Sequence, residues 1–136
     1  MITKKTEYAI RALSELASDP SRRMTANQVA QRQEIPPKYL PQIVSELSQA
    51  GLLHSVRGYG GGIRLARPPH EITLMQIIEA VQGPPILIDC QFGAGECSFM
   101  EDCSIRKIYD RALRAMRKEF ENARLSEVRT KRRGAD

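Results

Sequence analysis

The chain has 136 residues, and 41% of them are hydrophobic, which is enough for one modest core but not for two. A formal net charge of +5 and a pI near 9.4 permit binding to a polyanion such as nucleic acid. No apolar run is long enough to span a membrane, and no apolar stretch follows the first lysines as in a signal peptide, so we expect a soluble, cytoplasmic protein.

The charges fall into three blocks along the chain. Residues 1–83 carry ten Lys or Arg against seven Asp or Glu, residues 84–103 carry four acidic residues and no Lys or Arg, and residues 104–136 carry eleven Lys or Arg against five Asp or Glu. An acidic segment therefore separates two basic ones. We expect an N-terminal domain over residues 1–83, an irregular loop over 84–103, and a helix with a basic tail over 104–136.

The N-terminal domain begins with two predicted helices. Apolar residues recur at helical spacing over residues 6–17, and the sequence DPS at residues 19–21 then breaks the pattern. Thr25 followed by Gln28 has the form of a capping box, in which two side chains satisfy free N–H groups at a helix start. The second helix should therefore start at Thr25 and end near Gln33.

A third helix and a hairpin follow. Pro41 fits only in the first turn of this helix, because an interior proline removes a helical hydrogen bond, and Gly51 suits the helix end. Short apolar runs over residues 52–57 and 63–66 flank the sequence GYGGG at 58–62, which predicts a hairpin with a flexible tip. The apolar face of the third helix consists of Leu40, Ile43, Val44 and Leu47.

Three helices followed by a hairpin are typical of a winged helix-turn-helix. We therefore expect a mainly α fold with a small β-hairpin wing, and a fourth amphipathic helix over residues 73–81. A long C-terminal helix is predicted as well, because no Gly or Pro interrupts the helical pattern before Gly134, and its single apolar stripe favours dimerisation. The stripe consists of Ile105, Tyr109, Ala112, Met116, Phe120 and Ala123. The last cations, among them Arg129, Lys131, Arg132 and Arg133, are expected to form a solvated tail.

Two surfaces of this fold are candidates for DNA binding. The third helix shows a polar outer face that could enter the major groove and meet base edges. This face consists of Lys38, Gln42, Ser45 and Gln49. Arg57 stands beside the glycines of the wing tip, where the backbone could lie close to phosphates while the guanidinium enters the minor groove. The alternatives are an ordinary three-helix core and a plain glycine-rich hairpin.

Three cysteines lie within fourteen residues, in the pattern C-x6-C-x5-C. Their odd number argues against a disulfide framework. Thiolates are the ligands that iron-sulfur clusters and zinc prefer, but structural zinc sites generally contain a C-x2-C pair, which is missing here. The pattern formed by Cys90, Cys97 and Cys103 therefore favours an iron-sulfur cluster, with inert buried cysteines as the alternative.

Several of these stretches resemble one bacterial family, the iron-sulfur winged-helix transcription regulators that include the cluster-assembly repressor IscR and the nitric-oxide sensor NsrR. The matching sequences are TEYAIRAL at residues 6–13, IPPKYLPQI at 35–43 and AGLLHSVRGYGGGIRL at 50–65. The resemblance implies a homodimer joined by the long helix, wings in adjacent minor grooves and a palindromic operator.

By position, the resemblance also implies DNA contacts at Lys38, Tyr39, Pro41, Gln42 and Arg57. At Pro41 the cluster-assembly repressor has an acidic residue that tunes sequence choice, so its operator preference does not carry over. The expected DNA-binding surface is completed by Thr25, Gln28, Ser45, Gly58, Tyr59 and Gly60.

For the cofactor, the resemblance implies a 2Fe-2S or 4Fe-4S cluster on Cys90, Cys97 and Cys103. Where the cluster-assembly repressor has a histidine, this chain has Arg106, whose guanidinium offers no lone pair. The nitric-oxide sensor takes an acidic ligand from helix one of the other subunit, which matches Glu7 here. The alternatives to Glu7 as the fourth ligand are Glu96, Glu101, Asp102 or a small molecule, and Glu7 itself could simply pair with a basic side chain.

We therefore expect a DNA-binding repressor whose operator affinity depends on the assembly, oxidation, nitrosylation or loss of a cluster. One alternative is a cluster-free member of the same family that senses sulfur metabolism through a partner protein. Another is an enzyme or electron carrier, but His54 and His70 are the only histidines, and neither lies near the cysteines in the sequence.

Overall fold

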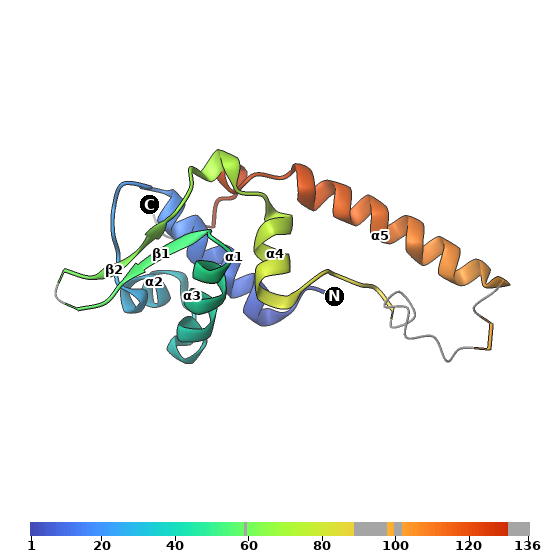
Figure 1. Cartoon of the computed structure of the whole chain (residues 1–136), viewed down its shortest axis with the longest axis horizontal. Coiled ribbons are helices and arrows are strands. Elements are labelled where there is room, and N and C mark those ends of the chain that lie inside the picture. Colours follow the sequence, from blue (N-terminus) through green and yellow to red (C-terminus); the bar gives the residue numbers. More distant parts are fainter. Residues whose placement is uncertain (59, 89–97, 100–101, 131–136) are drawn as a thin grey trace.

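The computed structural model describes residues 1–58, 60–88, 98–99 and 102–130. Three helices, a hairpin, a fourth helix and a long C-terminal helix follow one another (Figure 1). The expected mainly α fold with a two-stranded wing is therefore confirmed. The helices are α1 (Lys4–Ala17), α2 (Ala26–Gln33), α3 (Leu40–Gln49), α4 (Leu74–Gln82) and α5 (Ser104–Asn122), and the strands are β1 (Leu53–Val56) and β2 (Gly62–Leu65).

The start of α2 has the capping box that the sequence predicts. The Thr25 hydroxyl accepts the N–H of Gln28 at 3.1 Å, and the Gln28 side-chain oxygen accepts the N–H of Thr25 at 2.9 Å. The helix ends at Gln33, and the left-handed backbone of Glu34 (φ 55°), which follows it, turns the chain toward α3. The start of α2 is thus fixed by local sequence.

The start of α3 explains how the chain accommodates its prolines. Pro37–Tyr39 forms a 3₁₀ turn, and α3 follows with Pro41 as its second residue. Proline is tolerated there because the first N–H groups of a helix have no partner within the helix. The prediction that Pro41 lies in the first turn is confirmed.

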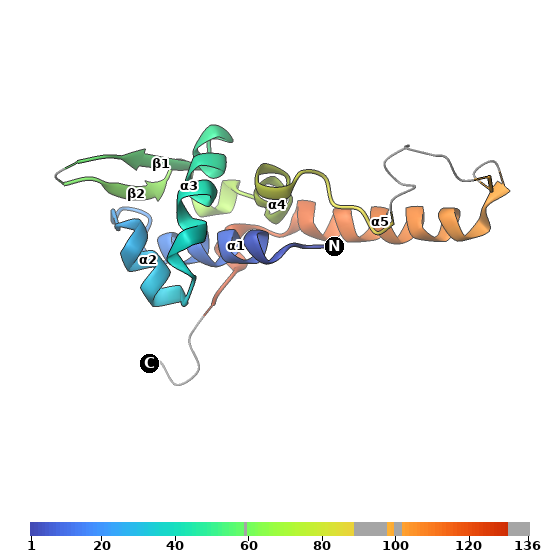
Figure 2. The ribbon, with the colours of Figure 1, turned by 90° about the horizontal axis from the view of Figure 1, so that it is seen from below.

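The core lies between α1, α3, α4 and the inner face of the wing. Leu13, Ile43, Leu47 and Ile77 are fully buried, and Ile63 of β2 is 3% exposed. In Figures 1 and 2, α1 and α4 lie against one another, with α2 and α3 beside α1. We refer to α1 through α4 with the wing, residues 1–83, as the body.

The wing is an antiparallel hairpin in which Leu53 pairs with Leu65 and Val56 pairs with Gly62. Strand β1 is two residues shorter than the predicted run 52–57, and β2 has the length of the predicted run 63–66 but begins one residue earlier. The sheet is extended by a contact that the sequence did not predict. Met24 exchanges two backbone hydrogen bonds with Ile63, at 3.1 and 2.6 Å. The segment before α2 therefore lies along the free edge of β2 and holds the wing on the body.

The predicted long C-terminal helix is confirmed. It ends at Asn122, one residue before the last member of the predicted stripe, and Ala123 adopts an extended conformation. The Ala123 carbonyl accepts the N–H of Leu74, Leu125 donates its N–H to the Ile72 carbonyl, and Leu125 is fully buried. Burial of Leu125 in the body outweighs the local helical preference.

The arm, as we call α5, leaves the body with its N-terminal end outermost (Figures 1 and 2). Its C-terminal half packs on α4, where Met116 and Phe120 are half-buried. Toward its start, Ile105 is 60% and Ile108 is 55% exposed. Only part of the predicted apolar stripe is therefore covered by the chain itself.

Candidate nucleic-acid interface and cluster site

The outer face of α3 presents the residues expected to meet base edges. Lys38, Pro41, Gln42 and Ser45 are exposed, whereas Ile43 on the opposite face is fully buried. The face is therefore polar and accessible along its length, as major-groove binding requires.

Tyr39 has a different environment from its neighbours in the expected contact set. Its ring is half-buried and packs on Tyr8 of α1, with ring centroids 5.1 Å apart, and Lys38 Nζ lies 5.4 Å from its centroid. Aromatic packing of this kind fixes the orientation of the side chain. Tyr39 thus anchors the start of α3 to α1.

At the start of α2, Thr25 and Gln28 are exposed, but their side chains already serve the capping box. The Thr25 oxygen and the Gln28 oxygen are occupied by backbone N–H groups. The Gln28 amide nitrogen retains its two N–H donors toward solvent. A phosphate contact at this position would therefore come from that nitrogen or from the Thr25 O–H, which the capping box leaves free to donate.

The wing tip is built from glycines with backbone conformations that other residues rarely adopt. Gly58 has φ 92° and Gly60 has φ 75°, and a Cβ at Gly61 would lie 2.3 Å from the Val56 carbonyl oxygen. Arg57 at this tip is exposed. Tyr59, also expected to contact DNA, lies outside the described residues.

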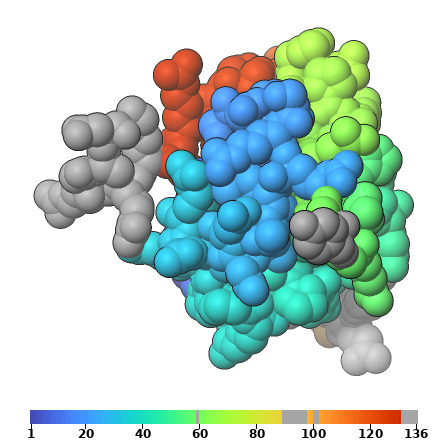
Figure 3. All heavy atoms as spheres, turned by 90° about the vertical axis from the view of Figure 1, so that its left-hand side faces the viewer, coloured from blue at the N-terminus to red at the C-terminus, as the bar shows by residue number. Residues whose placement is uncertain are grey.

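Sequence reasoning missed Arg23, which reaches the wing from the segment before α2. Its Nη1 donates a hydrogen bond to the Gly60 carbonyl at 3.1 Å, and Figure 3 shows this segment, in blue, against the green wing. Arg64 of β2 is exposed opposite His54. Of the salt bridges in the described part of the chain, none involves Arg23, Arg57 or Arg64. The sequence feature that could have indicated Arg23 is the pair of adjacent arginines at positions 22 and 23.

Of the expected cluster ligands, Cys103 lies within the described residues, and Cys90 and Cys97 do not. Cys103 caps α5, since its Sγ accepts the N–H of Arg106 at 3.4 Å, and the side chain is half-buried and free of a disulfide. Cys103 therefore places a sulfur atom, of the kind that iron-sulfur clusters take as ligand, at the start of α5.

Arg106 does not act as a stand-in for the missing histidine. Its Nε lies 4.0 Å from a carboxylate oxygen of Asp110, one turn further along α5. Asp102, one of the alternative fourth ligands, has an exposed side chain 3.7 Å from Lys107 Nζ. The alternatives Glu96 and Glu101 lie outside the residues that the structure describes.

Glu7 is separated from the cysteine site within one chain. It lies on α1 with its side chain 51% exposed and 3.2 Å from Lys4 Nζ. In Figures 1 and 2, α1 belongs to the body, whereas α5 begins at the far end of the arm. The single chain therefore shows the ion pair that was the alternative interpretation of Glu7.

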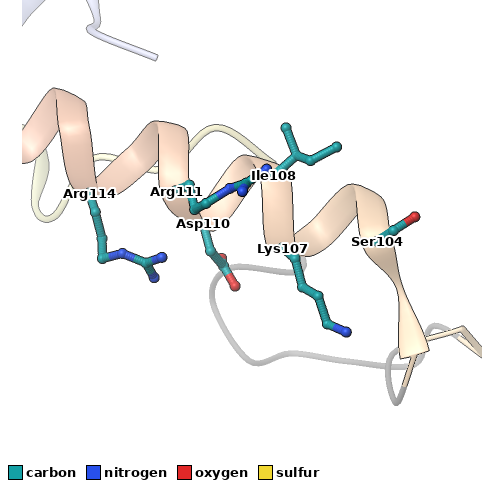
Figure 4. Close-up of a pocket in the computed structure, with 6 residues that line it drawn as sticks. All are labelled: Ser104, Lys107, Ile108, Asp110, Arg111 and Arg114. Atoms are coloured by element: carbon teal, nitrogen blue, oxygen red, sulfur yellow. The ribbon is translucent and has the colours of Figure 1, made fainter.

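An open hollow beside α5 has the character of a charged surface. It is lined by the six residues labelled in Figure 4, which are Ser104, Lys107, Ile108, Asp110, Arg111 and Arg114. Small-molecule sites are mostly apolar with a few convergent polar groups, whereas three of these six side chains are cations. We assign no small ligand to this hollow.

Within the described ranges, no helix is long and apolar enough to cross a membrane.

The winged fold and the exposed polar face of α3 define a helix-turn-helix DNA-binding protein. The sequence profile of the Rrf2 family, described as an iron-dependent transcriptional regulator, matches residues 2–131. The chain belongs to the Rrf2 family of DNA-binding transcriptional regulators, which is a family of regulators rather than of enzymes.

Three relatives illustrate this membership. An HTH-type transcriptional regulator of Rhodobacter capsulatus, described as rrf2-like, is 30% identical over 118 residues, covering 80% of this chain and 79% of that protein. The structure of T. potens IscR matches with a TM-score of 0.73 and 26% identity, over 93% of this chain and 84% of that one. CymR of B. subtilis, named the global cysteine regulator, matches with a TM-score of 0.74 and 26% identity, over 93% and 94%.

Proposed function

We propose that this chain is a homodimeric repressor of a palindromic operator, and that an iron-sulfur cluster bound through Cys90, Cys97 and Cys103 sets its operator affinity. The observation that carries the proposal is the position of Cys103 at the start of α5. A ligand at this position joins the cysteine segment directly to a helix that continues into the body. Ligand chemistry thereby acts on the orientation of that helix.

We place the interface with a second copy of this chain on the exposed half of the arm. Ile105 is 60%, Ile108 is 55% and Tyr109 is 37% exposed in the single chain. Large apolar side chains grouped on one helix favour an interface. A two-fold dimer also presents two copies of α3 and of the wing, which matches the symmetry of a palindromic operator.

The path from the cysteine segment to the DNA-binding face runs along α5. Arg117 of α5 binds Glu79 of α4 at 3.0 Å, and the chain after Asn122 pairs with residues 72–74 at the start of α4. Helix α4 in turn packs on α1 and α3. A change in the orientation of α5 is therefore transmitted through α4 to α3, the helix proposed to enter the major groove. The coupling is then a difference in DNA affinity between two orientations of α5.

For the fourth ligand we propose Glu7 of the partner subunit. Among the described residues, the exposed Glu7 side chain is held by an ion pair with Lys4 alone. Such surface pairs contribute about 0–1 kcal/mol, so the carboxylate is readily released. When bound, the cluster supplies iron that oxidants and nitric oxide attack, and a hard oxygen ligand holds that iron more weakly than thiolate does. A carboxylate from α1 would also connect the cluster of one subunit to the body of the other.

The test is anaerobic purification with visible absorbance, iron and sulfide analysis, followed by operator binding in cluster-bound and cluster-free forms. Cys97→Ala should abolish the absorbance. Glu7→Ala should retain a cluster with an altered spectrum and should weaken the dependence of DNA affinity on the cluster. A Glu7→Ala protein with the parent spectrum and full switching would remove Glu7 from the ligand set, and a parent protein without iron would remove the cluster.

The second candidate is a cluster-free regulator that senses sulfur metabolism through a partner protein. Its support is the likeness to the cysteine regulator CymR, which equals the likeness to IscR in both identity and coverage of this chain. The same experiment separates the two candidates. A cluster-free regulator would bind its operator without iron, and its affinity would change with the partner protein instead of with cluster state.

A further inference from the structure

A short polar network connects α1 to the DNA-facing surface of α3. One carboxylate oxygen of Glu46, Oε1, accepts a hydrogen bond from Lys5 Nζ at 2.9 Å and a second one from Gln42 Nε2 at 3.0 Å. The side chains of Lys5 and Glu46 are both 23% exposed, whereas Gln42 is exposed. Glu46 therefore stands between a largely buried cation and a residue of the expected major-groove face.

Stability alone does not account for this arrangement. The other carboxylate oxygen, Oε2 of Glu46, is buried without a hydrogen-bond partner within the described residues. A buried polar atom without a partner costs free energy, and taking the charges of Lys5 and Glu46 largely out of water has a desolvation cost that offsets much of their attraction. What the carboxylate does provide is a fixed acceptor for the Gln42 amide.

The consequence for Gln42 follows from amide chemistry. A glutamine amide has two N–H donors and one carbonyl oxygen, and its two ends are easily exchanged by rotation. With one N–H held by Glu46, rotation would bring the amide oxygen against a carboxylate, which repels it. The second N–H and the oxygen are left for a ligand, and this donor and acceptor pair matches the N7 and N6 groups of adenine in the major groove.

We propose that Glu46 is a positioning residue that fixes the Gln42 amide for reading one adenine in each half of the operator, and that Lys5 holds Glu46 and neutralises it near the phosphates. The inference rests on the proposed DNA contact at Gln42. The inference predicts different effects for the loss of Glu46 and the loss of Lys5. Loss of Glu46 impairs base preference, whereas loss of Lys5 leaves a carboxylate facing the DNA backbone and weakens binding to every sequence.

The matched control lies one turn along the same helix. Gln49 Nε2 donates to the Ser45 hydroxyl at 3.5 Å, and both residues are exposed. This pair has the same i, i+4 spacing as Gln42 and Glu46 but lacks the buried cation. Gln49→Ala therefore removes a side-chain pair from α3 without disturbing the network around Glu46.

The experiment is selection from a random-sequence double-stranded DNA library, followed by affinity measurements on the selected sequence and on base-substituted versions. The full chain is used as the parent and as the variants Gln42→Ala, Glu46→Ala, Glu46→Gln, Lys5→Met and Gln49→Ala. Gln42→Ala should reduce the preference for adenine at one position by about 5- to 150-fold. Glu46→Ala should reduce the preference at the same position, and Glu46→Gln should retain it because the amide oxygen still accepts the Gln42 N–H.

Lys5→Met should lower affinity for selected and unrelated DNA alike, with base preference unchanged, and Gln49→Ala should match the parent. The inference is overturned alone if Gln42→Ala loses the adenine preference while Glu46→Ala keeps it, or if Glu46→Ala and Glu46→Gln lose it equally. If the parent selects no sequence, or if Gln42→Ala changes no base preference, the proposed DNA contact fails and the inference fails with it.

Discussion

The body and the arm of this chain are held in opposite ways. Every helix of the body has fully buried side chains, such as Leu13 in α1 and Ile77 in α4. The arm is the longest helix, with 19 residues, and none of its side chains is buried. It is fixed at one end by Leu125, Arg117 and the pairing with residues 72–74. The body is therefore stabilised by its own core, whereas the arm leaves apolar side chains such as Ile105 and Ile108 exposed in the single chain.

The contrast between the body and the arm is tested most directly by making the exposed half of the arm polar. Ile105→Glu with Ile108→Glu should give monomers with a folded body, because carboxylates in an apolar seam are costly and these side chains touch little of their own chain. Operator affinity should fall to the non-specific level, at least ~10³-fold. Sedimentation and circular dichroism measure the two effects.

A second double variant refines that test. Met116→Glu with Phe120→Glu places charges where α5 packs on α4, so it should also lower the melting temperature of the body. If the Ile105 and Ile108 variant remains a dimer at micromolar concentration, the interface lies elsewhere.

The attachment of the arm is tested at Leu125, which is fully buried just beyond α5. Leu125→Ala should destabilise the chain by about 2–5 kcal/mol, because it leaves a cavity in the core. Urea unfolding measures this loss. Leu125→Met, which conserves volume, should cost less than about 1.5 kcal/mol, and equal losses for both variants would contradict the packing argument.

On the DNA-binding side of the body, Arg57→Ala should weaken operator binding by about 1–3 kcal/mol, because the exposed guanidinium contacts DNA without supporting the core. Fluorescence anisotropy on the selected operator measures the affinity. The dimer and the melting temperature should not change. Unchanged affinity at moderate salt would exclude Arg57 from the contact set.

The smallest expected effect concerns Arg23, which holds the wing tip through the Gly60 carbonyl. Arg23 is exposed beside the wing tip, so we expect it to contact one DNA phosphate as well, and Arg23→Ala should then reduce the slope of log affinity against log salt by about 0.9. Arg22→Ala is the control, because the Arg22 side chain makes no hydrogen bond in the part of the chain that the structure describes. Identical slopes for the two variants would show that Arg23 has no special role.

Where the sequence predicted correctly, local chemistry decided the outcome. The capping box of Thr25 and Gln28 and the position of Pro41 depend on backbone groups within a few residues. The glycine-rich tip between two apolar runs likewise defines the hairpin. The candidate DNA face followed from the same periodicity, because the residues opposite a buried stripe on a helix face outward.

What the sequence did not show comes from contacts between distant segments. The sequence after Asn122 contains no Gly or Pro before Gly134, and the burial of Leu125 in the body accompanies the end of α5. Met24 beside Ile63 and Arg23 beside Gly60 are likewise contacts between segments far apart in the chain. Local sequence patterns cannot predict such contacts, because the two segments are far apart in the chain.

The order of the elements, the winged fold, the polar outer face of α3 and the cysteine spacing could all be predicted along the chain. The residue at which the arm ends, the exposed part of its apolar face and the position of Glu46 between Lys5 and Gln42 came from tertiary packing. Caps, turns and periodicity are settled within one or two helical turns. The burial of a side chain and the partner of a charge depend instead on which segments pack together in space.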